Sequence, residues 1–483
     1  MKSMVKNSLY NIMYTLTNVF FSLLSSVYVS RILQPEGIGK YTYVLTFATY
    51  FVSFASLGIP VYGVREIAKA RTQEEKNRVF SELFILNLLT SVVALIVYII
   101  VIFESKVIRD DNDIGLYMRF SLLIASNILN IDWLYKGEES YGYIATRSAI
   151  VKICSILLLI LCVHDSQDVY KYADITILAS CGNYVCNIFH AKRYVKLSIS
   201  GLNFKRHIKP NVILAVSTIF GEIYNKIDIT MLGLFSTEHA VGIYGNAHKI
   251  VNIIITCCAA ITATFLPRVS SVAKENKRKT AQLVNKGLEI LVFLCIPFAV
   301  GLCSISSEAV LLLYGDDFLD TAVTIRFLSA LILIRGIGDL VCYQLLVGIG
   351  QEKLRIKANI ITTLLNIGLN RLLIPQMGEN GAALASVISE LFVNGYLYVK
   401  MRKIVLFDIN NVGIIHAAFS SLAMYLFVRF IGKISIPLPA SVLVSILGGS
   451  AVYAIANCLL KNPIMLLVVN QTKDRLKALQ KRK

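Results

Sequence analysis

Long apolar runs recur along the whole chain, and they limit its fold more than any other feature of the sequence. Fourteen runs are each long enough to cross a hydrocarbon layer of about 30 Å as a helix. In lipid, only helices and closed barrels satisfy their own backbone hydrogen bonds, and these runs lack the alternating pattern of barrel strands. We therefore predict an all-α polytopic membrane protein with about 14 transmembrane helices. The runs cover residues 8–31, 41–62, 82–103, 116–135, 143–163, 170–190, 210–234, 242–265, 284–304, 322–346, 355–374, 380–399, 411–431 and 438–460.

The composition agrees with a membrane protein and excludes an ordinary soluble or disordered chain. Hydrophobic residues make up 56% and charged residues 16% of the 483 positions, whereas soluble domains average about 45–50% and 25%. The net charge is +18, and 33 of the 48 Lys and Arg residues fall in the termini and the even-numbered loops, against six in the odd-numbered loops. Because basic residues concentrate in cytoplasmic loops, both termini are predicted to be cytoplasmic. The same rule explains the positive charge without a nucleic-acid partner.

The sequence lacks the usual signatures of catalysis. It contains no phosphate-binding P-loop, no nucleophile elbow and no HExxH motif, and its loops are short. The ten cysteines all fall within apolar runs and none forms a CxxC pair, so we interpret them as small hydrophobic residues rather than metal ligands. We therefore predict a carrier rather than an enzyme, with no cofactor and no metal.

Two short motifs recur with similar spacing. Residues 38–41 (Ile-Gly-Lys-Tyr) resemble residues 241–244 (Val-Gly-Ile-Tyr), and residues 137–140 (Gly-Glu-Glu-Ser) resemble residues 350–353 (Gly-Gln-Glu-Lys). The offsets of 203 and 213 residues span six runs, so both copies enter the membrane from the same side. This predicts two pseudo-symmetric six-helix bundles, an arrangement that carriers use for alternating access. The predicted domains are an N-terminal bundle at 1–200, a C-terminal bundle at 201–403, two additional transmembrane helices at 404–460 and a basic cytoplasmic tail at 461–483.

Ionisable residues inside the runs are the candidate functional residues, because a charge in lipid is expensive unless it faces a cavity or a partner. The spans hold more basic than acidic groups, which favours an anionic solute such as a phosphate. The candidate cavity cations are Lys226, Arg335, Lys152 and Lys249, with Arg31 and Arg371 near the outer mouth. The candidate ion-coupling groups are Asp228, Glu222, Asp339 and Glu390.

Spacing alone suggests partners for some of these charges. Glu222 and Lys226 are four residues apart, as are Arg335 and Asp339, so each pair would share one helix face. Two interpretations are possible for the cations deeper in the spans, Lys226, Arg335 and Lys152: each is either part of a buried ion pair or faces a solvated cavity. Arginines near the ends of runs are expected to reach the membrane interface instead; these are Arg147, Arg326 and Arg371.

Several longer motifs resemble a known family. They are residues 31–39 (Arg-Ile-Leu-Gln-Pro-Glu-Gly-Ile-Gly) followed by Tyr41, residues 58–60 (Gly-Ile-Pro), residues 63–68 (Gly-Val-Arg-Glu-Ile-Ala), and residues 228–233 (Asp-Ile-Thr-Met-Leu-Gly) with 241–244 and Ala247. The chain is similar in these motifs to the polysaccharide biosynthesis (repeat-unit) flippases. That family belongs to the superfamily of multidrug/oligosaccharidyl-lipid/polysaccharide exporters, and the resemblance covers nearly the whole sequence.

The resemblance implies a function. A flippase of this kind moves a lipid-linked oligosaccharide, typically carried on undecaprenyl diphosphate, across the bacterial inner membrane for O-antigen or capsule synthesis. Its expected partners are that glycolipid, the membrane lipids and a polysaccharide polymerase. Two alternatives stay open. One is an ion-coupled antiporter of the multidrug and toxin extrusion type, which would use acidic groups such as Asp132, Asp228 and Glu390. The other is a non-transporting scaffold of a glycan-assembly complex.

Overall fold

A computed structural model describes residues 2–480 except 105–113, 199, 273–275 and 408–410. Throughout these residues the regular structure is helical, and none of them lies in a strand. The chain divides into two compact units, one up to Gly242 and one from Ile243 onward, and each is described by itself. The predicted all-α class is therefore confirmed, while the predicted domain limits stay predictions.

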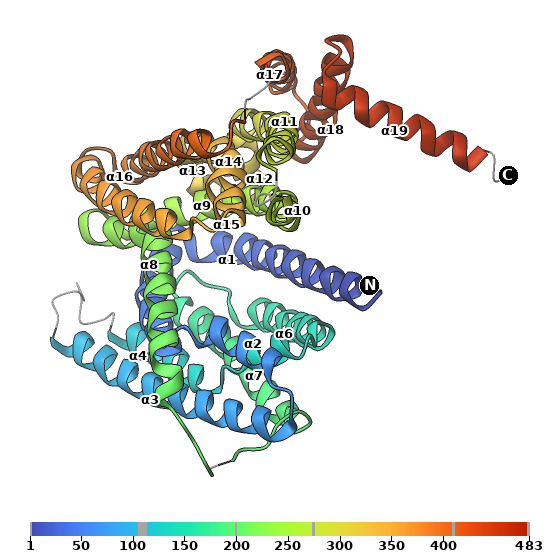
Figure 1. Ribbon diagram of the computed structural model, residues 1–483. Helices are drawn as coiled ribbons and strands as arrows, with labels where there is room; N and C mark the ends of the chain where they lie inside the picture. The colour runs from blue at the N-terminus through green and yellow to red at the C-terminus, as the bar shows by residue number, and fades with distance from the viewer. Residues whose placement is uncertain (1, 105–113, 199, 273–275, 408–410, 481–483) are drawn as a thin grey trace. The chain divides into compact units, whose positions relative to one another are not determined.

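Unit 1 is organised around its first helix. α1 packs against α3, α4, α6 and α8 of the same unit, and it runs through the N-terminal, blue part of the ribbon in Figure 1. A second core surrounds Trp133, where a Cβ at Gly63 would come within 2.6 Å of the indole ring. The elements are α1 (Lys2–Ser56), α2 (Ile59–Lys69), α3 (Gln73–Glu104), α4 (Ile114–Ser126), η2 (Asn127–Leu129), α5 (Asp132–Gly137), α6 (Tyr141–Cys162), α7 (Val169–Ala191), α8 (Lys205–Phe235) and the first turn of α9 (Glu238–Thr262).

Unit 2 begins within α9 and holds the remaining helices. α11 packs against α14 and α17, and α17 packs against α18. The predicted run at 322–346 is divided among four short elements rather than forming one α-helix. The elements are α10 (Phe265–Val272), α11 (Lys277–Ser304), α12 (Ser306–Leu313), η3 (Asp316–Phe318), α13 (Thr321–Leu328), α14 (Ala330–Gly338), the π-helical turn η4 (Asp339–Leu345), α15 (Leu346–Gly348), α16 (Glu352–Ile404), α17 (Asn411–Ile431), α18 (Leu438–Leu459) and α19 (Pro463–Gln480).

Two of the helices are bent pairs. α1 breaks at Gln34, whose φ is 59°, because the ring of the following Pro35 disfavours the α conformation there. α16 breaks at Gly378, whose φ of 55° is accessible to glycine without strain. The predicted run 8–31 therefore lies in α1, the run 41–62 begins in α1 and ends in α2, and the runs 355–374 and 380–399 lie in α16.

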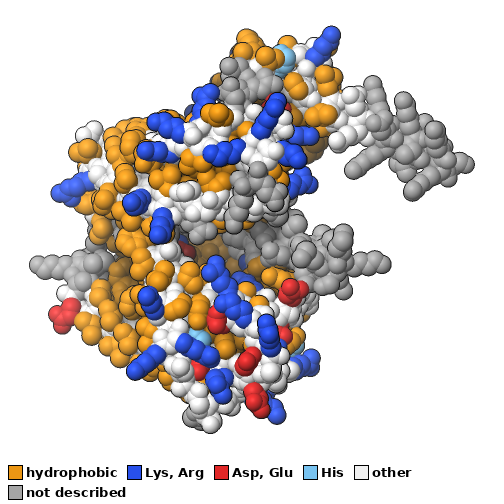
Figure 2. Space-filling view, in the orientation of Figure 1, with side chains coloured by type: hydrophobic (Ala, Val, Ile, Leu, Met, Phe, Trp, Pro, Cys, Tyr) orange, Lys and Arg blue, Asp and Glu red, His pale blue; other side chains and the backbone are white. Residues whose placement is uncertain are grey.

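The helices carry an apolar surface suited to lipid. Nine helical segments within the described residues are long and apolar enough to cross a membrane, and two of these, 53 and 52 residues long, contain the bent pairs. Large apolar side chains such as Leu161, Leu364 and Phe419 are exposed, and Figure 2 shows hydrophobic side chains over much of the visible face. The chain is thus a multi-pass membrane protein, but the predicted number of fourteen spans is not confirmed.

Candidate functional site

Arg147 lies at the centre of a buried polar cluster in unit 1. Its Nη1 is 3.1 Å from Oδ1 of Asp132 on α5, and its Nε donates to Oδ1 of Asn183 on α7 at 3.0 Å. Asn187, also on α7, contacts Arg147 and donates to Asp132 at 2.6 Å. The expectation that Arg147 reaches the membrane interface is therefore wrong. Its partner is a carboxylate at the start of α5, which only the packing of α5, α6 and α7 brings close.

Lys152 differs from Arg147 because it keeps its charge unneutralised. The side chain is partly buried on α6, and within the described residues it forms no ion pair or hydrogen bond. It lies four residues after Ser148, whose hydroxyl donates to Oδ1 of Asn18 on α1 at 3.4 Å. Lys152 therefore shares the face of α6 that packs near the polar residues of α1. Lys152 is thus a predicted cavity cation without a carboxylate partner in the part of the chain that the structure describes.

The predicted pair on α8 is confirmed. Lys226 Nζ lies 3.7 Å from Oε2 of Glu222, and the two side chains are 27% and 37% exposed. The contact is long and partly solvated, so it constrains the lysine weakly. Asp228 is buried on the same helix, and Thr230 one turn after Lys226 shares a 2.7 Å hydrogen bond with Tyr50 of α1.

In unit 2, Arg335 binds an acidic group from another helix. Its Nε donates to Oε1 of Glu390 on α16 at 2.7 Å, and Asn394 donates to the second oxygen of that carboxylate at 2.8 Å. The interpretation that Arg335 pairs with Asp339 is wrong. The backbone N–H of Asp339 still bonds to the carbonyl of Arg335, so the two residues share a helix face, but the guanidinium of Arg335 turns to Glu390 of α16 instead. Asp339 instead accepts hydrogen bonds from Thr262 and Gln344.

Three other predicted cations are placed by the structure. Lys249 is partly buried on α9. Arg31 and Arg371 are exposed, and each precedes the break of a bent helix, at Gln34 and at Gly378 respectively. The predicted site residues thus divide between the two units. That these residues line a single cavity is a prediction from the sequence.

Glu82 is a buried acid that the sequence analysis did not single out. Its side chain is fully buried on α3, where it accepts from Nε2 of His207 at 2.7 Å and from the guanidinium of Arg206. The backbone N–H of Asn203 also donates to it at 2.6 Å. These contacts hold the start of α8 against α3. The distance of 124 residues between Glu82 and Arg206 gave no local signal that they pair.

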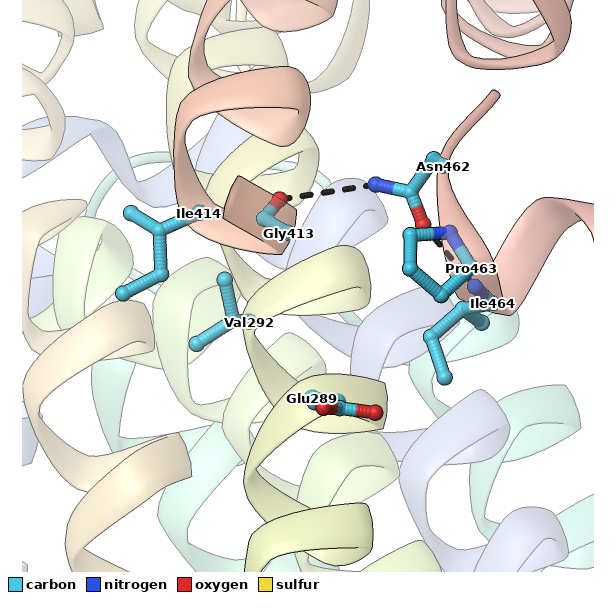
Figure 3. Close-up of a pocket in the computed structure, with 7 residues that line it drawn as sticks. All are labelled: Glu289, Val292, Gly413, Ile414, Asn462, Pro463 and Ile464. Atoms are coloured by element: carbon cyan, nitrogen blue, oxygen red, sulfur yellow. Dashed lines mark hydrogen bonds between the residues drawn. The ribbon is translucent and has the colours of Figure 1, made fainter. Parts of the chain in front are cut away.

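A small, partly open pocket lies in unit 2 where α11, α17 and the connection from α18 to α19 meet (Figure 3). Asn462 fixes that connection, because it donates to the carbonyl of Gly413 at 3.4 Å and accepts from the N–H of Ile464 at 3.0 Å. None of the predicted site residues lines this cavity. The described residues also hold no cluster of three His, Cys, Asp or Glu side chains that would bind a metal ion. The residues around the cavity are Glu289, Val292, Gly413, Ile414, Asn462, Pro463 and Ile464.

The family model described as "Polysaccharide biosynthesis protein" matches residues 4–273. The chain belongs to this family. Curated relatives with related names align with this chain over most of their own length. A relative from Escherichia coli (strain K12), named as an O-antigen transporter, is 22% identical over 83% of this chain and 97% of its own. A Staphylococcus aureus capsular polysaccharide biosynthesis protein is 23% identical over 82% and 99%. A Haloferax volcanii relative named as a low-salt glycan biosynthesis flippase is 24% identical over 70% and 73%.

Solved structures share the fold. The lipid II flippase MurJ in an inward closed conformation superposes with a TM-score of 0.76, covering 94% of this chain and 99% of its own at 16% identity. An inward-facing multidrug transporter of the MATE family superposes with a TM-score of 0.63, covering 81% and 94% at 16% identity. At such identities the likeness shows the fold alone, which is the fold shared by MurJ and the MATE transporters.

Proposed function

We propose that this protein is a flippase for a lipid-linked oligosaccharide. The observation that carries the proposal is its membership in the polysaccharide biosynthesis family, together with relatives named for O-antigen, capsule and glycan transport. The fold shared with MurJ supports the same function. The substrate would be an oligosaccharide repeat unit on undecaprenyl diphosphate, moved across the bacterial inner membrane by alternating access for surface polysaccharide synthesis. A polysaccharide polymerase would take the product.

The charges of the spans suit such a substrate. A diphosphate is bound best by cations that are not already in strong ion pairs, because the free energy of breaking such a pair reduces the affinity for the substrate. Lys152 has no carboxylate partner among the described residues, and Lys226 has only the 3.7 Å contact with Glu222. Arg335 is held at 2.7 Å by Glu390 and is better suited to joining α14 and α16. We therefore place Lys152 and Lys226 first among the diphosphate ligands.

The acidic groups support the antiporter alternative less well. A carrier of cationic drugs would need carboxylates that are open to the drug, but Asp132 is bound by Arg147 and Glu390 by Arg335. Arginine stays protonated throughout the accessible pH range, so both carboxylates keep a permanent counter-ion.

The positions of the termini are part of the proposal. The excess of Lys and Arg in the termini and even-numbered loops supports an inner-membrane protein with both ends in the cytoplasm. In this orientation, an inward-open state would receive the diphosphate where the glycolipid is made. An outward-open state would release it at the opposite leaflet.

An export assay in cells tests the role of Lys152. In a host that depends on this protein for surface glycan, Lys152→Ala should lower surface glycan at normal protein abundance, whereas Lys152→Arg should retain most of it. Lys69→Ala is the matched control, because Lys69 is 71% exposed and pairs only with Glu66 on its own helix. Normal export by Lys152→Ala would remove Lys152 from the diphosphate site.

A further inference from the structure

The pocket of Figure 3 lies where two apolar helices leave the membrane. Its residues from α17 belong to the first turn of that helix, and its residues from the α18–α19 connection follow the end of α18 within five positions. Both α17 and α18 are long and apolar enough to cross a membrane. Phospholipid headgroups lie just outside the hydrocarbon layer that such helices cross. The pocket is therefore at the depth of the headgroups.

Glu289 on α11 brings a carboxylate to this pocket. It lies within the predicted run 284–304, its side chain is half-buried, and it borders the pocket in Figure 3. Among the described residues, no Lys, Arg or His forms an ion pair with it and no group donates a hydrogen bond to it. A charge inside a span is expensive unless a partner compensates it. The pocket thus presents an uncompensated negative charge at the depth of the headgroups.

The other groups around the pocket suit a small ammonium rather than a bulky one. The carbonyl of Gly413 accepts from Nδ2 of Asn462 at 3.4 Å, a long contact that leaves a lone pair for a second donor. Of the described residues that line the pocket, none is aromatic, whereas quaternary ammonium groups are typically bound in aromatic cages. A primary ammonium has three N–H donors for the carboxylate and carbonyl oxygens.

Two lysines next to the pocket add positive charge beside the carboxylate. Lys461 directly precedes Asn462 in the chain, and Lys286 lies one turn before Glu289 on α11. Both side chains are exposed, and neither forms an ion pair within the described ranges. Their charges match the phosphate that a phospholipid headgroup carries next to its ammonium. The charges around the pocket are therefore complementary to a zwitterion.

We propose that this pocket binds a phospholipid whose headgroup ends in a primary ammonium, as in phosphatidylethanolamine. The ammonium would donate to the carboxylate of Glu289 and to the carbonyl of Gly413, while Lys286 and Lys461 would attract the phosphate. The acyl chains would lie on apolar side chains that are exposed along α17, such as Ile415. A soluble amine would leave this apolar surface uncovered, so a lipid is the better ligand.

A bound lipid would stabilise the packing of the helices around the pocket. α11 packs against α17 and contacts the start of α19, and all three border the pocket. A ligand that binds the folded state and not the unfolded chain raises the stability of the folded state. This site does not depend on the proposed flippase function.

Competition between two lipids tests the site. The delipidated full-length protein is mixed with equal amounts of phosphatidylethanolamine and phosphatidylcholine that carry the same acyl chains, and native mass spectrometry counts the lipids that stay bound. The wild type should retain more phosphatidylethanolamine. Glu289→Gln should lose this excess, because the neutral amide does not attract the ammonium. Glu308→Gln is the control and should keep the excess, since Glu308 lies in α12, beyond the opposite end of α11.

Thermal unfolding gives a second readout. The midpoint of the wild type should rise more with phosphatidylethanolamine than with phosphatidylcholine, and O-phosphoethanolamine, which lacks acyl chains, should give no rise at the same concentration. Lys461→Ala changes an exposed side chain and should retain less of both lipids while still preferring phosphatidylethanolamine.

Equal retention of the two lipids by the wild type would overturn the site, whether or not Glu289→Gln folds. An unchanged excess of phosphatidylethanolamine on folded Glu289→Gln would also overturn it. A rise with O-phosphoethanolamine as large as that with the lipid would assign the pocket to a soluble amine, which contradicts the proposal. Full retention of both lipids by Lys461→Ala would contradict the contact with the phosphate.

Discussion

Arg147 and Arg335 each lie in a predicted span and each bind a carboxylate from another helix. Burying two charges is costly, and their attraction compensates only while both partners are present. Removing one partner leaves the other charge in a poorly solvated place. These arginines are therefore expected to matter for stability, while Lys152 and Lys226 are expected to matter for the substrate.

Replacing Arg147 tests this division. Arg147→Ala should lower the free energy of unfolding by about 3–5 kcal/mol, because it leaves the carboxylate of Asp132 without its counter-ion. Arg119→Ala breaks an ion pair that is exposed on both sides and should cost about 1 kcal/mol or less. Denaturant unfolding in one detergent compares the two variants. Equal losses would show that the Arg147 cluster is not a buried ion pair.

Asp168 gives a prediction about pH. Backbone N–H donation from His164 and the ion pair with Lys171 lower the pKa of the Asp168 carboxyl from 3.8 to about 2. A carboxyl whose folded-state pKa is lowered adds stability above its unfolded-state pKa and loses it as pH falls through the folded value. Asp168→Asn should therefore have a lower melting temperature than the wild type at pH 7. This difference in melting temperature should become smaller as the pH falls from 4 to about 2. A gap that stays constant over that range would contradict the prediction.

Sequence reasoning located the charged residues but found only one of their partners. The Glu222–Lys226 pair was predictable because four residues on one helix fix its geometry. Asp132 and Arg147 are 15 residues apart on different helices, and Arg335 and Glu390 are 55 apart. Such pairs depend on how helices pack, which the spacing of one helix does not encode. The amides Asn183 and Asn187, one turn apart on α7, were the available sign of a polar helix face.

At the scale of elements, the glycines of the repeated motif permit a close helix crossing. A Cβ at Gly39 of α1 would overlap the backbone oxygen of Glu238, and a Cβ at Gly242 of α9 would overlap that of Pro35. The two repeated glycines thus lie where α1 and α9 meet. The sequence predicted that this motif recurs, and the structure supplies the reason for the glycine in it.

A larger side chain at this crossing should separate the helices. Gly39→Val should lower the melting temperature, and the loss should exceed that of Gly182→Ala, because a Cβ at Gly182 meets nothing within 4 Å. Thermal unfolding of the two variants with the wild type makes the comparison. If Gly39→Val has the same melting temperature as the wild type, α1 and the start of α9 do not approach each other as described.

The helices were more predictable than their breaks. Each predicted apolar run lies in a helical region, because hydrophobic length is a local property of the sequence. The break before Pro35 has a local cause in the proline ring. No local feature of the sequence predicts the π-helical turn at Asp339. The close contact beside it joins Gly338 and Asn394, which are 56 positions apart in the sequence.

At the scale of the whole molecule, the distribution of basic residues predicts the orientation of the chain. A green fluorescent protein fused to the C-terminus should fluoresce, and alkaline phosphatase fused there should be inactive, because both report a cytoplasmic end. The same fusions after residue 165, in a predicted outer loop, should give the reverse result. Fluorescence at both positions would refute the predicted topology.

The class of protein and its family were within reach of the sequence, since composition, charge asymmetry and long motifs act over the whole chain. The substrate site was not. The predicted cations are found in both units, and which of them are held by carboxylates depends on how the helices of each unit pack. Lys152 emerged as the leading candidate only when the partners of Arg147 and Arg335 were known.

Flipping by the purified protein tests the central claim most directly. The protein is reconstituted into vesicles with a fluorescent oligosaccharide on undecaprenyl diphosphate, and an impermeant reductant bleaches the label in the outer leaflet. Wild-type vesicles should lose label from both leaflets, and Lys152→Ala vesicles should do so more slowly. If vesicles holding the folded wild-type protein lose only the outer label, as protein-free vesicles do, this protein is not a flippase for that glycolipid.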